Sequence, residues 1–153
     1  MFKIYSRFGI WIAVILIAYF LLLKIVGLHQ YPVLSAANGL IYAIGLYMAM
    51  KTYRSRKTTR LKYEKGFEVG LFCGGIATIL FTIFMAIYMY QIDGEFAANI
   101  MESWDLEYDL GTLMLLISLL IMGFATTLVL TLAFMQLLKN SWNTPDGNRN
   151  TMK

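Results

Sequence analysis

A strongly basic segment in the middle of the chain separates two long apolar regions and limits how the chain can fold. Residues 51–65 hold seven of the thirteen Lys and Arg residues and one acid, Glu64. Moving Lys and Arg across a bilayer is costly, so a basic loop between apolar segments is retained on the cytoplasmic side during insertion. Once this loop is placed in the cytoplasm, every other segment is assigned to one side of the membrane.

The composition excludes an ordinary soluble domain. The 153-residue chain is 59% hydrophobic and 14% charged, whereas soluble domains are about half apolar and about a quarter charged. The formal charge of +4 comes from short basic segments beside apolar runs, and a nucleic-acid-binding protein needs a folded basic face instead. We therefore expect membrane lipids as partners and no nucleic acid.

Four uncharged runs, with their flanks, match the roughly 20 helical residues that a bilayer crossing needs. We predict an all-α fold, an integral membrane four-transmembrane-helix bundle. The bundle is a single domain, residues 1–138, followed by a flexible cytoplasmic tail, residues 139–153. The expected spans are residues 8–28, 31–50, 67–91 and 110–138.

The distribution of charge gives the spans a direction. The amino end, the basic segment and the carboxyl end hold twelve of the thirteen Lys and Arg residues. Residues 93–109 hold six acids and no Lys or Arg. Because Lys and Arg accumulate in cytoplasmic segments, we predict a multi-pass protein of the bacterial inner (cytoplasmic) membrane with both termini cytoplasmic.

Small residues spaced by four indicate where the helices pack, because such rows let two membrane helices approach closely. Packing within the bundle is the first interpretation, and an interface with another membrane protein or a second copy is the alternative. The predicted packing or partner interface consists of Gly66, Gly70, Gly74, Thr78, Thr82, Gly39, Ala43, Gly123 and Thr127.

Two polar residues, Asn38 and Tyr42, lie four positions apart inside the second apolar run. Unpaired polar groups are costly in an apolar layer. We therefore expect both side chains to face protein, either in a structural hydrogen bond or in a functional pocket.

The acidic outer connection is predicted to contain a short amphipathic surface helix, at about residues 94–105. Asp93 is a suitable N-cap, and apolar residues repeat every four positions after it. Lys24, at the outer end of the first span, either extends toward lipid headgroups or donates an ion pair to this loop. The predicted acidic or partner surface consists of Asp93, Glu95, Phe96, Glu102, Trp104 and Asp105.

The sequence contains no recognised catalytic or phosphate-binding motif, and its single cysteine is Cys73. No acidic or basic residue lies deep in a span, although proton-coupled carriers use such residues. We therefore predict no catalytic residues, no metal site, no cofactor and no enzymatic activity.

The segment Lys62-Tyr-Glu-Lys-Gly-Phe-Glu-Val-Gly70, followed by Ile92-Asp-Gly-Glu-Phe96 and Met101-Glu102, resembles a family of small bacterial membrane proteins. The chain is similar to domain-of-unknown-function family forty-one ninety-nine, common in Bacteroidota, with Gly94 where the family motif usually has proline. The resemblance implies four transmembrane helices, an inner-membrane location and no established activity, so it assigns no catalytic residues.

Three functions remain open at this point. The first is a non-enzymatic subunit or scaffold that packs with partner membrane proteins or lipids. The second is a small channel or transporter with an acidic outer vestibule. The third, a lipid-modifying enzyme, requires a cleft beside Asn38, Tyr42 or the acidic loop.

Overall fold

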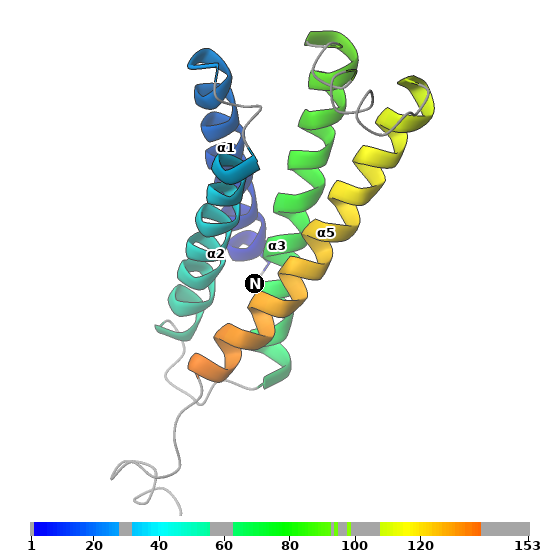
Figure 1. The fold of residues 1–153 in the computed structure, drawn as a ribbon. Helices are drawn as coiled ribbons and strands as arrows, with labels where there is room; N and C mark the ends of the chain where they lie inside the picture. Colours follow the sequence, from blue (N-terminus) through cyan, green and yellow to red (C-terminus); the bar gives the residue numbers. More distant parts are fainter. Residues whose placement is uncertain are drawn as a thin grey trace, which may run out of the picture.

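The computed structural model describes residues 2–27, 32–55, 63–92, 94, 98 and 108–138. Nearly all of these residues belong to four long helices, which confirms the all-α prediction. The long helices are α1 (Phe2–Ile25), α2 (Pro32–Ser55), α3 (Tyr63–Ile87) and α5 (Tyr108–Leu137), and a π-helical turn, η1 (Tyr88–Ile92), continues α3. Consecutive long helices run in opposite directions (Figure 1).

Among the described residues, three helical stretches are long and apolar enough to cross a membrane: Tyr5–Ile25, Lys65–Ile92 and Leu110–Leu137. α2 has a comparable length of 24 residues, about 36 Å at 1.5 Å per residue. It is more polar, with Asn38 in its first half and Lys51 and Arg54 at its end. The crossing of the membrane by α2 therefore stays a prediction.

The predicted tail, residues 139–153, lies outside the described residues, and so does most of the predicted surface helix. Within the predicted surface helix, residues 94–105, the structure describes Gly94 and Ala98, and both are helical.

Gly27 ends the first helix. It has a φ of 74°, in the left-handed region that glycine adopts without steric cost. Its N–H donates a hydrogen bond to the Lys24 carbonyl oxygen, with an N–O distance of 2.9 Å. The helix therefore stops with a glycine after its last turn, a common way for helices to end.

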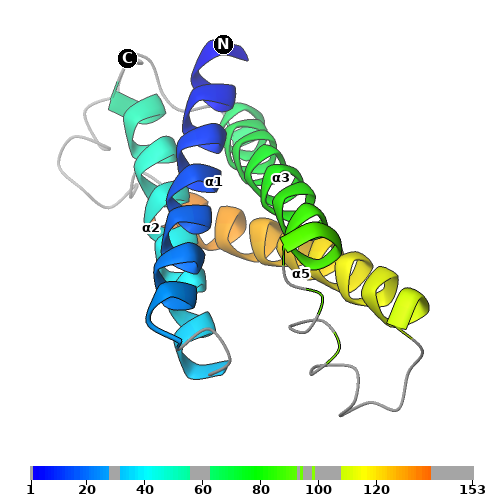
Figure 2. The same ribbon diagram turned by 90° about the horizontal axis from the view of Figure 1, so that it is seen from above.

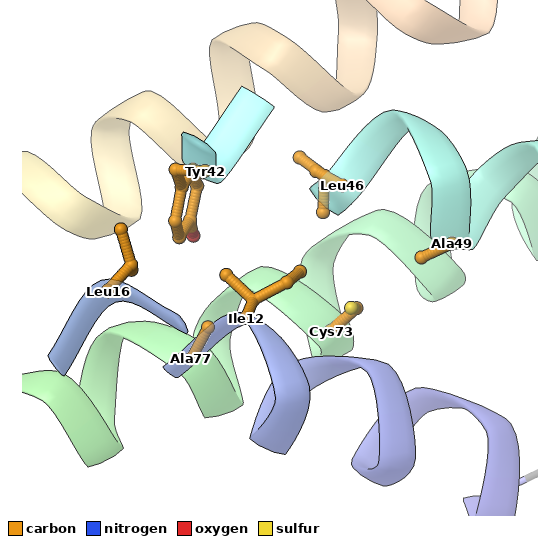
Figure 3. Packing of buried hydrophobic residues seen from close by; sticks show 7 residues of the cluster. All are labelled: Ile12, Leu16, Tyr42, Leu46, Ala49, Cys73 and Ala77. Carbon is orange, nitrogen blue, oxygen red and sulfur yellow. The ribbon is translucent and has the colours of Figure 1, made fainter. Parts of the chain in front are cut away.

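The third helix is the centre of the bundle, because it packs most extensively, against α1 and α5 above all and also against α2 (Figures 1 and 2). Figure 3 shows buried side chains of α1, α2 and α3 meeting in one cluster. Further clusters lie toward the two ends of α3, around Val69 and around Tyr88. The central cluster consists of Ile12, Leu16, Tyr42, Leu46, Ala49, Cys73 and Ala77.

Glycines and threonines interlock where α3 crosses α5. A Cβ added to any of three glycines would overlap a threonine side chain of the other helix. All three threonines are buried, so each fills the space that a glycine leaves and the two backbones approach closely. The interlocked pairs are Gly70–Thr131, Gly74–Thr127 and Thr78–Gly123.

Two further glycines bring α1 close to its neighbours. A Cβ on Gly9 would lie 2.8 Å from the Cys73 carbonyl oxygen, and a Cβ on Gly45 would lie 2.6 Å from a side-chain carbon of Ile12. Each glycine is followed four residues later by a buried alanine, Ala13 or Ala49. These two pairs were not predicted from the sequence, although they have the same spacing of four as the small residues of α3.

The outward surfaces of the helices are apolar. Large hydrophobic residues are exposed along α1 and α5, among them Trp11 at 60%, Leu22 at 60% and Met122 at 69%. Such extensive apolar exposure is unfavourable in water and suits a lipid environment.

The interlocked pairs predict that glycine and threonine can exchange places between α3 and α5. Gly70→Thr should lower the free energy of unfolding by about 1–3 kcal/mol, because it adds volume to a filled contact. Gly70→Thr combined with Thr131→Gly should recover most of that loss. Thermal unfolding in detergent, followed by circular dichroism, measures both variants.

The matched control for this exchange is Gly39→Thr, because a Cβ at Gly39 has no atom within 4 Å. This variant makes the same chemical change without overlap, so it should cost less than Gly70→Thr. A double variant as unstable as Gly70→Thr alone would contradict the interlocking.

Candidate ligand pocket

An open pocket of about 160 Å³ lies between the four long helices. An engineered apolar cavity of about 150 Å³ in another protein binds benzene, so this pocket has room for an apolar group of similar size. Two lining residues, Gly39 and Thr126, are exposed and mark the opening. The lining residues are Leu16, Asn38, Gly39, Tyr42, Thr78, Phe81, Leu119, Gly123 and Thr126.

A cluster of hydroxyl groups reaches the inner wall of the pocket, which Tyr42 and Thr78 line. The Tyr42 hydroxyl donates to the Gly74 carbonyl oxygen at 2.9 Å. It also lies 3.2 Å from the Thr78 hydroxyl and 2.5 Å from the Thr127 hydroxyl. Tyr42 thereby links α2 to the crossing of α3 and α5, and the glycines of that crossing make the contact possible.

The Tyr42 and Thr127 hydroxyls donate their protons to oxygen atoms of the protein itself. Thr127 donates to the carbonyl oxygen of Gly123, one turn earlier in its own helix, at 2.7 Å. The Tyr42 proton has three oxygen acceptors within reach, on Gly74, Thr78 and Thr127. Since each hydroxyl has one proton, Tyr42 and Thr127 are satisfied as donors without a ligand.

Asn38 differs from this cluster. Its side-chain oxygen is buried and has no hydrogen-bond partner among the described residues. Asn38 and Tyr42 do not bond each other, since the Tyr42 hydroxyl bonds to α3 and α5. The long tyrosine side chain reaches across to the next helices, which leaves Asn38 at the pocket.

The predicted small-residue interface is divided between two environments. Gly66, Gly70, Gly74, Thr78 and Thr82 are all buried in α3, and Thr127 is buried in α5. The structure therefore places these residues in packing within one chain. Gly39 is exposed, Ala43 and Gly123 are half-buried, and of these three only Gly39 and Gly123 line the pocket.

Lys24 lies over an aromatic ring. Its Nζ is 4.5 Å from the centroid of the Tyr88 ring, within the range of a cation–π interaction. Tyr88 is fully buried and begins the π-helical turn. The predicted acidic partners of Lys24, including Asp93, lie outside the described residues, so the ion pair stays a prediction.

The remaining predicted surface also lies outside the described residues: Asp93, Glu95, Phe96, Glu102, Trp104 and Asp105. The acidic vestibule of a channel or transporter is therefore untested. Near the other end of the bundle, Glu68 pairs with Lys65 at 3.0 Å in the first turns of α3, where the two charges lie side by side on the helix surface.

Five of the nine lining residues were singled out from the sequence: Asn38 and Tyr42 as polar residues of the second span, and Gly39, Thr78 and Gly123 as part of the predicted interface. Leu16, Phe81 and Leu119 resemble any other apolar residue of a span, and only the arrangement of the helices brings them together. Thr126 carried a partial signal, because it directly precedes a residue of the predicted interface.

Comparison with known proteins gives a family but no activity. The family model described as "Protein of unknown function (DUF4199)" matches residues 7–140. The chain therefore belongs to this family, as its resemblance indicated. No curated protein and no solved structure matches the chain.

The hydroxyl cluster predicts a measurable role for Tyr42 in stability. Tyr42→Phe should lower the free energy of unfolding by about 0.5–1.5 kcal/mol, the net value of a typical hydrogen bond. Tyr90→Phe is the control, since Tyr90 is 51% exposed. Equal unfolding temperatures of the two variants in detergent would show that the Tyr42 hydroxyl does not stabilise the bundle.

Proposed function

We propose that this member of the DUF4199 family is a four-span membrane protein that binds a lipid-like molecule in the pocket between its helices. It acts as a non-enzymatic binding subunit. The observation that carries the proposal is the open pocket, which combines an apolar lining with a hydroxyl cluster and the unpartnered oxygen of Asn38.

The proposed membrane arrangement has four crossings. Three helical stretches are long and apolar enough to cross, and α2 packs with them as the fourth. Basic residues follow α2 and precede α3 in the chain, so these ends face the cytoplasm and both termini lie on the same side. The membrane is the bacterial inner membrane.

A lipid fits the pocket better than a partner helix does. The glycine–threonine ridge that could have received another helix is filled by α5 of the same chain. The pocket opens beside exposed apolar residues of α2, such as Leu40 and Ile44, which face lipid in the proposed arrangement. A molecule dissolved in the bilayer would reach the pocket without crossing water.

The chemistry of the lining favours binding over catalysis. Its nine residues supply hydroxyl and amide groups, and none of them is Asp, Glu, His, Cys, Lys or Arg. General acid–base catalysis depends on groups that titrate near the working pH, whereas hydroxyl and amide groups orient a ligand. The cleft that a lipid-modifying enzyme would require is present, and we assign it to binding.

The membrane arrangement predicts opposite exposure of residues 56 and 102. In a Cys73→Ala background, Glu102→Cys should react with a membrane-impermeant maleimide from outside the cell. Arg56→Cys should react only after the inner membrane is permeabilised. Labelling of both positions from the same compartment would refute four crossings with a cytoplasmic basic segment.

The pocket predicts photolabelling at a defined place. A straight-chain alkane with a diazirine, incorporated into nanodiscs with the protein, should label the pocket residues of α2, α3 and α5. Gly39→Ile should reduce pocket labelling to background, because a larger side chain there occupies the opening while its Cβ meets no atom within 4 Å.

Ala18→Ile is the matched control for this experiment, since Ala18 is exposed on α1 and does not line the pocket. Its pocket labelling should equal that of the wild-type protein. Label spread evenly over the outward surfaces, with no dependence on Gly39, would contradict a binding pocket.

A further inference from the structure

The unpartnered oxygen of Asn38 identifies the kind of molecule that the pocket accepts. Buried side-chain oxygens in proteins normally have a hydrogen-bond partner, and an exception calls for an explanation. Asn38 lies six residues after Pro32, about 9 Å along α2 from its first residue. In the proposed arrangement the oxygen is therefore below the headgroups, where water competes little for hydrogen bonds.

Asn38 differs from the other buried oxygens that lack a partner. Tyr5, Thr82 and Thr131 also have unpartnered hydroxyl oxygens, but none of them lines the pocket. A threonine hydroxyl in a helix can rotate to bond the carbonyl of the preceding turn. The Asn38 oxygen accepts hydrogen bonds only, so its partner must bring a donor.

The hydroxyls on the pocket wall do not bond to the Asn38 oxygen. Tyr42 and Thr78 share a hydrogen bond, and Tyr42 also bonds to Gly74 and Thr127. Ester carbonyls and ethers of ordinary lipid chains are acceptors and have no proton to offer. A hydroxyl or an amide N–H on the ligand can donate to the Asn38 oxygen, whereas an ester or an ether cannot.

We propose that the pocket selects an apolar chain that carries a hydrogen-bond donor, a hydroxyl or an amide N–H. The Asn38 side chain turns its buried oxygen into the pocket to accept from this donor, and the chain lies against Leu16, Phe81 and Leu119. This inference rests on the proposed function, since it names the class of ligand for the same pocket. The volume of about 160 Å³ accommodates the donor group and the adjoining part of the chain.

A matched pair of competitors tests this selection. Dodecanol and its methyl ether have the same chain, and only the alcohol has a donor. Each is added to nanodiscs that hold the full-length protein and the diazirine alkane, and loss of pocket label is measured against the competitor's mole fraction in the bilayer. The alcohol should displace the label at about a two- to tenfold lower mole fraction, because one net hydrogen bond increases affinity by about that factor.

Two variants assign the preference to Asn38. Asn38→Leu removes the acceptor and should make the alcohol and the ether equally effective. Ser118→Ala is the control, because Ser118 is an exposed hydroxyl of α5 outside the pocket lining. This control should keep the full preference for the alcohol.

The outcomes separate this inference from the proposed function. Equal displacement by both compounds in the wild-type protein overturns the donor selection and leaves lipid binding intact. A preference that persists in Asn38→Leu also overturns it. Absence of pocket label before any competitor is added overturns lipid binding itself. The comparison in the wild-type protein decides the question even if Asn38→Leu does not fold.

Discussion

The close crossing of α3 and α5 is the contact on which the rest of the bundle depends. Between membrane helices there is little hydrophobic gain from leaving lipid, so association depends on close packing and hydrogen bonds. The crossing provides both. Its glycines receive threonine side chains, and the same approach brings the Gly74 carbonyl and the Thr127 hydroxyl within reach of Tyr42. The packing of two helices thereby positions the polar wall that α2 contacts.

The pocket follows from where α2 contacts α5 and where it does not. Tyr42 reaches Thr127, and the ring of Tyr47 lies 5.4 Å from that of Phe134. One turn before Tyr42, α2 presents Gly39, which has no atom within 4 Å of an added Cβ. A large residue at position 39 would occupy this space. The pocket therefore exists because Gly39, which has no side chain to fill the space, directly follows Asn38.

The sequence predicted repeating features better than single contacts. The spacing of four from Gly66 to Thr82 indicated a packing face, since a helical period repeats along the chain and is visible without coordinates. Gly9 and Gly45 are each followed by a single small residue four positions later, and two residues are too few to form a recognisable pattern. The partners of Tyr42 lie 32 to 85 residues away, so only the assembled bundle reveals them. The same holds for Lys24, whose ammonium group faces Tyr88.

The distribution of polar groups indicates where this protein would interact with other molecules. Exposed parts of α1 and α5 carry large aliphatic residues such as Val14 and Val129, which gain little by exchanging lipid for another apolar surface. The hydroxyls of Tyr42 and Thr127 are already paired inside the bundle. Specific recognition within the membrane requires a group that lipid chains leave unsatisfied, together with room to reach it. Among the residues that line the pocket, Asn38 provides that group and Gly39 provides the room, so the proposed selectivity depends on the first half of α2.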